Sequence, residues 1–337
     1  MESVTHQQTT IATWAAAVER ALNSYTCSVE EVNQLFSNSA IDQTRLMDAN
    51  YRIPVVAMTK LWRSSVLLTG DEAFGLRVAE FVSPTTFHAL GYAAMASKNF
   101  SEAVQRIIRN ARLVSDIAEM KLEMNSDGIC LCFDLSEGSP DVADEAIDAF
   151  TGALIYMSRH YMHAEVPLLS VEFVRQLPEN PDRFHTFFGV TVAFGCEANR
   201  FVVDPSVATA LIPTYNSTLL EANEKVMEEY LQQTGLSSIT EVVRGHIAAV
   251  LPEDPVLDRI AEKMHMSGRK LQRKLQSEAT SYQKVLDSYR QEKAEAWLSD
   301  NQKSIKQVSD LLGFANQSAF TRAFKRWTGY TPKKTMR

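Results

Sequence analysis

The chain has 337 residues, of which 45% are hydrophobic and 22% are charged. This composition is typical of a globular protein of about two domains and excludes a disordered or fibrous chain. Four cysteines are too few for a disulfide framework, so we expect a reducing, cytoplasmic setting. No window reaches the ~18 consecutive apolar residues of a spanning helix and the first residues lack a secretion signal, so neither membrane insertion nor export is expected.

The net charge of −7 hides two segments of opposite sign. Residues 244–337 carry 18 Lys and Arg against 10 Asp and Glu, whereas residues 1–243 carry 16 against 31. A basic module attached to an acidic domain predicts a polyanionic partner such as nucleic acid. The alternative is a chance excess of solvated charge, and a motif within the module is needed to decide between the two.

A domain boundary is predicted near residue 235. The amphipathic stretch 219–233 is followed by Gly235, and Ser238 with Glu241 three residues later forms a capping-box start for a helix that stops at Pro252. The predicted organisation is a first domain at 11–233, a linker at 234–237 and a second domain at 238–337.

The first domain is predicted to be α+β with helices dominant, which makes the whole chain mainly α. Ser28, Asp71, Ser83 and Ser101 are the predicted helix starts. Apolar residues at helical spacing predict helices at 11–26, 28–38, 54–69, 71–82, 84–97, 101–120 and 141–163.

A small sheet is expected in the same domain. Met120–Met124 and Ile129–Leu135 flank the turn sequence Asn-Ser-Asp-Gly, which predicts a hairpin. Two further strands are predicted at Leu169–Phe173 and Asn199–Val203, with an aromatic-rich loop at residues 183–195 between them.

The basic module is predicted to be all-α and to contain a first helix-turn-helix at residues 254–276. Asp254 caps a helix whose first position is Pro255, and Ser267 starts the second helix. Placed at 100° intervals, Leu271 and Leu275 share one side of that second helix. The opposite side carries Arg269, Gln272, Arg273 and Gln276, with Lys270 and Lys274 on the flank.

This division of side chains is what a reader of the DNA major groove requires. Arg pairs bidentately with guanine and Gln with adenine, while Lys neutralises the phosphates beside the groove. The alternative is an amphipathic helix with a solvated polar face, but it does not explain why residues 269–274 hold four cations and no acid.

A second copy of the pattern follows at residues 304–328. Ser304 starts its first helix and Gly313 supplies the turn. Phe320, Phe324 and Trp327 gather on one arc of its second helix. The predicted base contacts of this copy are Gln317, Ser318, Thr321 and Arg322, and the predicted phosphate contacts are Lys306, Lys325 and Arg326.

A predicted helix at residues 281–298 joins the two copies. At 1.5 Å per residue it spans ~27 Å, which approaches the ~34 Å pitch of B-DNA once packing offsets are added. One chain could therefore present two reading helices to successive turns of the major groove.

The module resembles the DNA-binding domain of the AraC/XylS family of bacterial transcription regulators. The resemblance runs from Ile305 through GF, SAF and RAFKRWTGYTP to Pro332 and extends over the whole module. Two positions depart from the family pattern. His265 stands at a turn position where Gly is frequent, which His tolerates because it can enter left-handed conformations, and Ser309 replaces a common Ala.

The first domain is similar to the sensor domain of the ornithine-utilisation-type branch of this family, rather than to the sugar-binding cupin of the arabinose regulator. The similarity runs over residues 15–215, in the segments RVAEFVSPTTFHALGYAAMASKNFSEAVQRIIRNARLVSD and HTFFGVTVAFGCEANRFVVDPS. It implies sensing of a small-molecule effector and formation of a homodimer. The family resemblance also implies double-stranded promoter DNA and RNA polymerase as partners, and activation of transcription.

Three other groups of residues were weighed as sites. His160 and His163 with Glu165 have metal-ligand spacing, but no third ligand is evident, so no metal or other cofactor is predicted. Cys130 and Cys132 share one side of a strand and are expected to be buried apolar residues rather than a redox or metal pair. Candidates for an effector pocket are Phe184, Phe187, Phe188 and Phe194, although aromatic clusters usually belong to a core.

No catalytic residue is predicted, because the sequence has no P-loop, nucleophile elbow, HExxH or dinucleotide motif. The leading hypothesis is a ligand-responsive, sequence-specific transcription regulator. The alternatives are an enzyme fused to a DNA-binding tail and an architectural DNA-binding protein without an effector.

Overall fold

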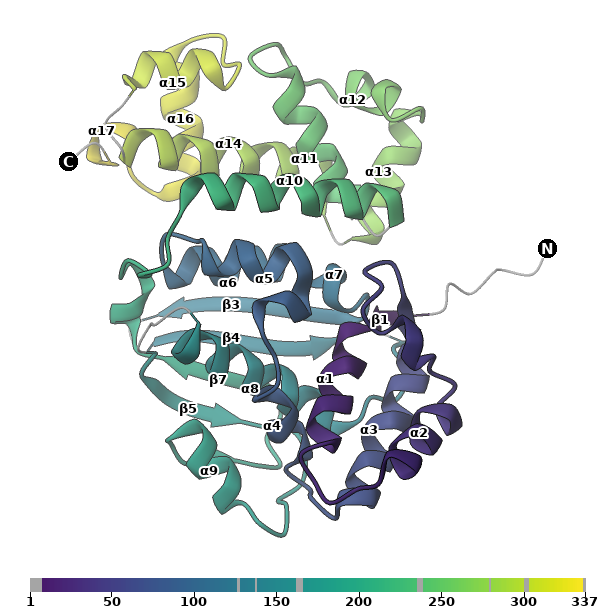
Figure 1. The fold of residues 1–337 in the computed structure, drawn as a ribbon. Coiled ribbons are helices and arrows are strands. Elements are labelled where there is room, and N and C mark those ends of the chain that lie inside the picture. Colours follow the sequence, from purple (N-terminus) through teal and green to yellow (C-terminus); the bar gives the residue numbers. More distant parts are fainter. Residues whose placement is uncertain are drawn as a thin grey trace. The chain divides into compact units, whose positions relative to one another are not determined.

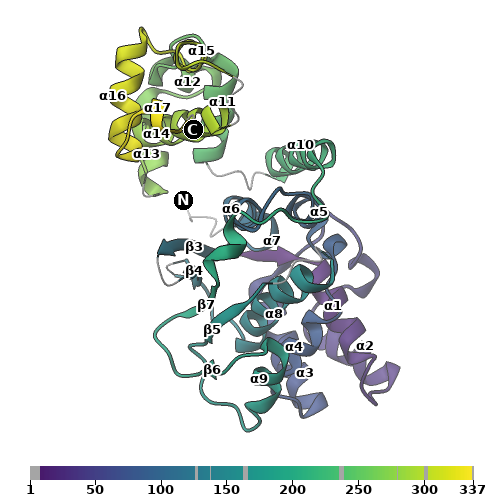
Figure 2. The ribbon, with the colours of Figure 1, turned by 90° about the vertical axis from the view of Figure 1, so that its left-hand side faces the viewer.

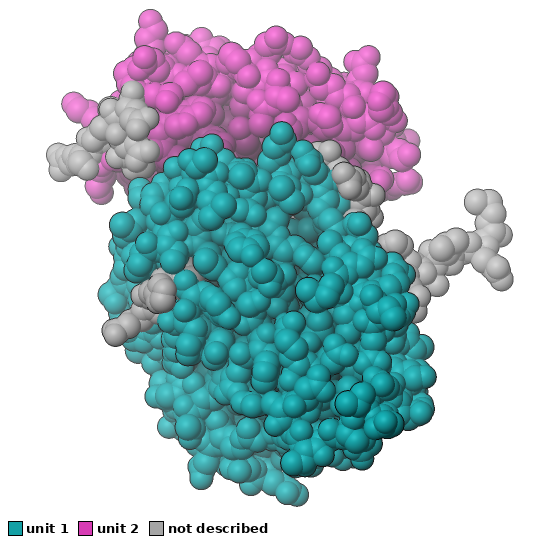
Figure 3. All heavy atoms as spheres, in the orientation of Figure 1, with its two compact units in different colours: residues 1–236 teal, residues 237–337 magenta. Residues whose placement is uncertain are grey.

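A computed structural model describes residues 8–125, 128–136, 138–161, 166–234, 239–278, 280–299 and 303–335. The chain divides into two compact units, unit 1 at residues 1–236 and unit 2 at residues 237–337 (Figure 3). As the fold class predicted, unit 1 combines helices with small sheets and unit 2 is helical.

Unit 1 is mostly helical (Figure 1). Its α-helices are α1 (Thr13–Leu22), α2 (Val29–Asn38), α3 (Val55–Thr69), α4 (Phe74–Ala79), α5 (His88–Met95), α6 (Phe100–Arg109), α7 (Ala111–Val114), α8 (Asp144–His160), α9 (Asp182–Phe188) and α10 (Ser217–Thr234). Short 3-10 helices lie at Gln43–Arg45, Pro84–Phe87 and Pro205–Ala208.

Five strands of unit 1 form one sheet in the order β3-β4-β7-β5-β6. They are β3 (Ala118–Asn125), β4 (Gly128–Leu135), β5 (Leu168–Glu172), β6 (Val192–Ala193) and β7 (Asn199–Val203). The predicted hairpin is confirmed: β3 and β4 are antiparallel from Ala118 opposite Leu135 to Asn125 opposite Gly128. Residues 126–127 of its turn lie outside the described residues, and a separate two-stranded sheet pairs β1 (Thr9–Ile11) with β2 (Arg52–Pro54).

Alternation along the strands places the core of unit 1. Ile129, Leu131 and Phe133 of β4 are buried in a cluster that also contains Ile155 of α8. Helix α8 therefore covers one face of the sheet, as Figure 2 shows. In Figure 1, α6 lies beside β3, the edge strand of the sheet.

The extents of two predicted segments of unit 1 were wrong. The helix expected at 101–120 ends at Arg109, and the chain then forms α7 and enters β3 at Ala118. The aromatic-rich loop at 183–195 contains α9 and β6 instead, because Phe184 and Phe188, four residues apart, share the buried side of a helical turn.

The predicted helix starts are partly confirmed. Ser28 forms a capping box with Glu31, and Ser83 forms one with Thr86 at the start of a 3-10 helix. Asp71 accepts a hydrogen bond from the Ala73 backbone N–H, but α4 begins only at Phe74. Ser101 was wrong, because Asn99 caps α6 by accepting a bond from the Glu102 N–H at 2.9 Å.

Unit 2 is a bundle of short helices around one long helix. These are α11 (Ile239–Val250), α12 (Leu257–Lys263), α13 (Gly268–Ser277), α14 (Tyr282–Ser299), α15 (Ile305–Leu311), α16 (Gln317–Thr328) and α17 (Pro332–Thr335). Helices α12 and α13 form the first helix-turn-helix, and α15 and α16 form the second. Both pairs were predicted.

The start of α12 differs from the prediction. Asp254 and Pro255 precede the helix, which has Val256 at its N-cap and begins at Leu257. The Val256 N–H donates to the Asp254 carbonyl at 3.1 Å, and this turn delays the helix. The predicted cap of α11 lies outside the described residues, since Ser238 and the side chain of Glu241 are not among them.

A buried ion pair joins α8 of unit 1 to the segment after β5. Asp148 is fully buried and pairs with the guanidinium of Arg175, which also lies over the ring of Phe184. Burial raises the pKa of Asp148 to about 8, because lost hydration outweighs the attraction of Arg175. Asp148 therefore depends on Arg175 for much of its stabilisation as a carboxylate.

We expect Arg175→Met to lower the free energy of unfolding of unit 1 by about 1–3 kcal/mol at pH ~7, because the buried Asp148 carboxyl loses its hydrogen-bond partner, and by about 3–5 kcal/mol where that carboxyl is ionised. Both proteins should lose stability as the pH rises from ~4 to ~8, since the unfolded carboxyl ionises near pH 4 while the buried one holds its proton, and the deficit of the variant should grow only above pH ~8, where the wild-type Asp148 ionises in the folded state and the variant's does not. Urea unfolding at several pH values measures both effects.

Arg200→Met is the matched control, because Arg200 is half exposed in its pair with Glu172. It should cost less than about 1 kcal/mol. Equal losses in the two variants would contradict the role given to the buried pair.

Candidate nucleic-acid interface

The polar face of α13 is exposed to solvent. Ser267 caps the helix by accepting a hydrogen bond from the Lys270 N–H at 3.3 Å. Leu271 and Leu275 are fully buried, as their shared side predicted. The exposed residues of this helix include Arg269, Lys270, Gln272, Arg273, Lys274 and Gln276.

Gly268 at the start of α13 lies close to α12. A Cβ atom on Gly268 would lie 2.2 Å from a carboxylate oxygen of Asp258 of α12, so a side chain at this position would displace that exposed carboxylate. His265 in the turn has φ of 53°, the left-handed conformation expected for it.

Helix α16 presents a similar face. Its N-cap is Asn316, which accepts a bond from the Ala319 N–H at 2.9 Å, and Phe320 and Phe324 are fully buried. The exposed predicted contacts of the second helix-turn-helix are Lys306, Gln317, Ser318, Arg322, Lys325 and Arg326.

Thr321 and Arg326 are predicted contact residues that form side-chain interactions within unit 2. Thr321 is half-buried and its hydroxyl donates to the Gln317 carbonyl at 2.9 Å. Arg326 forms an ion pair of 3.1 Å with Asp287 of α14. A phosphate at Arg326 would therefore compete with, or add to, an existing carboxylate partner.

Helix α14 belongs to the cores of both helix-turn-helix pairs. Its Val285 and Leu286 are buried with α11, α12 and α13. Its Ala294 and Leu298 are buried with α15 and α16. Eighteen residues at 1.5 Å give α14 a length of ~27 Å, so one rigid element connects the two pairs.

Arg290 of α14 is a connecting residue that the sequence did not reveal. Its Nε donates to the Leu312 carbonyl at 2.9 Å and one Nη to the Gly313 carbonyl at 3.3 Å, while its guanidinium lies over Phe314. Burial lowers the pKa of Arg290, and Asp254 and nearby acids oppose that shift. The guanidinium thus holds the turn of the second pair.

The same turn reaches the first pair. Gly313 has φ of +68°, and a Cβ atom there would lie 2.9 Å from the Pro252 carbonyl in the loop between α11 and α12. The start of α11 is held by Glu278, whose carboxylate accepts bonds from the N–H groups of Ile239 and Thr240 at 2.8 and 3.0 Å. Neither contact has a local sequence signature.

The other groups weighed from the sequence lie in unit 1. His160 stacks on Tyr156, with ring centroids 4.0 Å apart, while His163 and Glu165 lie outside the described residues. Among the described residues no cluster of three or more His, Cys, Asp or Glu could hold a metal ion. Cys130 and Cys132 have their Sγ atoms 3.5 Å apart, and burial raises the pKa of Cys130 to about 12.

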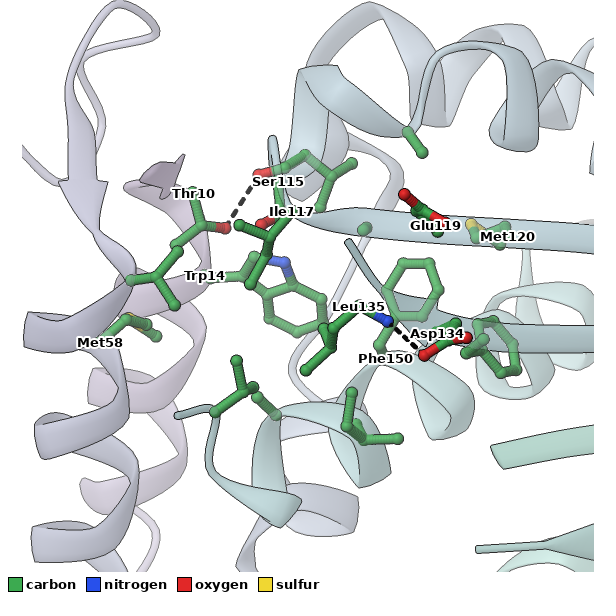
Figure 4. A pocket seen from close by; sticks show the side chains of 18 of the residues that line it. Thr10, Trp14, Met58, Ser115, Ile117, Glu119, Met120, Asp134, Leu135 and Phe150 are labelled. Carbon is green, nitrogen blue, oxygen red and sulfur yellow. Dashed lines mark hydrogen bonds between the residues drawn. The ribbon is translucent and has the colours of Figure 1, made fainter. Parts of the chain in front are cut away.

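The four phenylalanines proposed for an effector pocket lie in the core of unit 1. Phe184 and Phe188 are fully buried, and Phe187 and Phe194 pack against the same cluster. None of them lines an apolar cavity that lies beside Trp14 in unit 1. That cavity, of about 110 Å³, is bounded by α1, α3, α6, α7, α8 and the strands β3 and β4 (Figure 4).

Two helix-turn-helix pairs with exposed cationic and amide side chains, built on one shared helix, define a DNA-binding protein. A family model described as "Arabinose-binding domain of AraC transcription regulator, N-term" matches residues 31–210, and one described as "Helix-turn-helix domain" matches residues 260–337. The chain belongs to the AraC family and is a ligand-responsive, DNA-binding transcription regulator.

Two relatives in sequence support this assignment. The Ornithine utilization regulator of Pseudomonas aeruginosa is 28% identical over 307 residues, 88% of each chain. The HTH-type transcriptional activator CsvR of Escherichia coli is 32% identical over 131 residues, 39% of this chain and 48% of that protein. The crystal structure of the transcriptional regulator CdpR from Pseudomonas aeruginosa aligns over 99% of each chain with 20% identity and a TM-score of 0.45.

No helix within the described residues is long and apolar enough to cross a membrane.

Two serines of α15 lead to opposite predictions. Ser309 is fully buried and its hydroxyl has no hydrogen-bond partner among the described residues, whereas Ser304 forms a capping box with Gln307. We expect Ser309→Ala to stabilise α15 and α16 by about 1 kcal/mol and Ser304→Ala to destabilise them by about 1 kcal/mol. Amide hydrogen exchange of peptides from both helices measures the change, and effects of the same sign would disprove the analysis.

Proposed function

We propose that one chain inserts α13 and α16 into two successive segments of the major groove of promoter DNA. The observation that carries this proposal is that both helices expose Arg and amide side chains while a single helix, α14, supports both. A helix fits the major groove, and Arg and Gln side chains read base edges there.

The proposal assigns a role to each exposed polar residue. Base edges are contacted by Arg269, Gln272 and Arg273 of α13 and by Gln317, Ser318, Thr321 and Arg322 of α16. Phosphates are contacted by Lys270, Lys274, Lys306, Lys325 and Arg326. Since Arg326 pairs with Asp287, its phosphate contact also releases or shares that carboxylate.

Unit 1 controls this engagement in the proposed mechanism. A small-molecule effector binds unit 1 and shifts the population of chains, or of homodimers, whose α13 and α16 meet the promoter together. The bound regulator then recruits RNA polymerase and activates transcription in the cytoplasm. Transcription in vitro from the cognate promoter should rise with protein and effector, and a fall would indicate repression instead.

The protein acts by binding rather than by turnover in this proposal. The named relatives are regulators, which supports this assignment. Stoichiometric uptake of the effector, with the compound recovered unchanged, is the expected result, and its chemical conversion would favour the enzyme alternative.

Base reading predicts a selective loss of affinity. We expect Arg273→Ala and Arg322→Ala each to cost ~1–3 kcal/mol on a cognate site chosen from random DNA with the full chain, and to leave binding to non-cognate DNA nearly unchanged. Fluorescence-anisotropy titrations on both DNAs measure the difference. An equal loss on both would contradict base reading.

Arg259→Ala is the matched control, because Arg259 is an exposed arginine of α12 that pairs with Glu253 and lies outside both reading helices. It should leave the preference for the cognate site unchanged.

A lysine that contacts phosphate should affect affinity differently from an arginine that reads bases. Lys270→Ala should weaken cognate and non-cognate binding alike and lower the slope of log K against log salt by about 1, since one fewer counterion is released. Titrations between ~50 and ~200 mM salt measure that slope. A loss confined to the cognate site would instead assign Lys270 to base reading.

A further inference from the structure

The cavity of unit 1 has the size of a small organic molecule. Its volume is about 110 Å³, and an apolar protein cavity of ~150 Å³ is large enough to bind benzene. The volume is somewhat smaller than that benchmark, so a single ring is the largest group that the cavity encloses, and a short substituent would extend through its opening.

The walls of the cavity are mostly apolar. Trp14 and Trp62 meet edge to face with ring centroids 6.3 Å apart. Phe133 and Phe150 meet in the same way at 5.4 Å. Aliphatic lining comes from Val55, Met58, Ile107, Val114, Ile117, Leu135, Val142 and Ile147. Such a surface favours an apolar ligand body.

The charges around the cavity argue against an ionic ligand. No Lys, Arg or His lines it, so an anion would find no partner. Its charged lining residues, Glu119 and Asp134, are exposed and stand opposite each other on β3 and β4. They alternate with Met120 and Phe133, which pack into the core, so the carboxylates point to the other face of the sheet and leave a cation without a partner inside.

Trp14 supplies one hydrogen-bond donor to the cavity. The side chain is only 6% exposed, and no residue that the structure describes accepts a hydrogen bond from its indole N–H. Figure 4 shows the indole nitrogen among the side chains that line the cavity, with no hydrogen bond drawn to it. An indole N–H can only donate, so an oxygen atom that enters the cavity, from water or from a ligand, can serve as its acceptor.

The neighbouring hydroxyl groups are already committed as donors. Thr10 donates to the Val114 carbonyl at 2.8 Å, Thr59 to the Asp141 carbonyl at 3.0 Å, and Ser115 to the Thr9 carbonyl at 3.5 Å. Trp14 is therefore the donor that selects a ligand.

We propose that this cavity binds a small, uncharged, mainly apolar molecule that carries one carbonyl or ether-type oxygen facing the indole N–H of Trp14. The binding site stands on the geometry of unit 1 alone. The consequence for DNA rests on the proposed function.

Helix α6 contacts both the cavity and α10, the last helix of unit 1. Ile107 of α6 lines the cavity, and the preceding residue, Arg106, donates from Nε to Glu224 of α10 at 2.9 Å. Helix α10 is the last element of unit 1. A ligand that packs against Ile107 thereby stabilises one placement of α6 and of the helix that leads toward unit 2.

The test compares four probes of one shape on the full chain by isothermal titration calorimetry. Acetophenone offers the acceptor, ethylbenzene lacks it, benzoate is an anion and benzylamine is a cation. We expect acetophenone to bind about threefold to tenfold more tightly than ethylbenzene, the effect of one hydrogen bond, and both ions to bind more weakly than either. Tighter binding of either ion, or no binding by any probe, would overturn the proposal.

Variants distinguish the contribution of the Trp14 hydrogen bond to ligand affinity from that of the apolar walls. Trp14→Phe should bring acetophenone down to the affinity of ethylbenzene, and Trp297→Phe in unit 2, the matched control, should change neither. Ala146→Leu, which fills the cavity, should remove binding of both probes. An unchanged preference for acetophenone in Trp14→Phe would contradict the role of the indole.

A DNA titration with and without acetophenone keeps the two proposals distinct. Failure of all probes to bind, with cognate DNA still bound, overturns the ligand class and leaves the DNA interface standing. Binding of acetophenone with unchanged DNA affinity overturns the route through α6.

Discussion

The shared helix α14 is the constraint on which the DNA-binding unit depends. Val285 and Leu286 complete the core around α11, α12 and α13, and Ala294 and Leu298 complete the core around α15 and α16. Each core is small, so neither helix pair buries enough apolar surface without α14. Stability and spacing therefore come from the same element, and Arg290 adds a direct bond from it to the second turn. A regulator that reads two groove segments needs this coupling, because a flexible connection would cost binding free energy.

The two parts of the chain differ in net charge as well as forming separate compact units. The excess of cations lies after residue 243, and the exposed faces of α13 and α16 hold many of them, whereas the first 243 residues are strongly acidic. Electrostatic attraction to DNA is therefore confined to the reading unit, and the acidic part opposes adhesion elsewhere. In unit 1, Asp148 is paired with Arg175, and Glu119 and Asp134, the charged residues at the cavity, are exposed and alternate along their strands with Met120 and Phe133, which face the core. The cavity therefore offers a ligand mainly apolar contacts and one hydrogen-bond donor, the indole N–H of Trp14.

The sequence predicted most where local rules decide the structure. The cap at Ser267, the buried side of α13 and the strands of the β3–β4 hairpin follow from caps, periodicity and turn residues, and all were correct. Prediction failed where partners are distant in the chain. Glu278 at the start of α11 and Arg290 on the second turn join segments 22 or more residues apart. The walls of the cavity come from several elements, so no single segment of the sequence indicates it, and the four phenylalanines named as pocket candidates lie in or against the core.

The most direct test of the central claim is a hydroxyl-radical footprint of the full chain on its cognate site. If α14 holds two reading helices at a fixed spacing, the footprint will show two protected segments about one helical turn apart on one face of the duplex. Insertion of either 5 or 10 base pairs between them will then abolish protection of one segment, because a rigid helix cannot follow. A single protected segment on the natural site, or retention of both after a 10-base-pair insertion, would contradict the account.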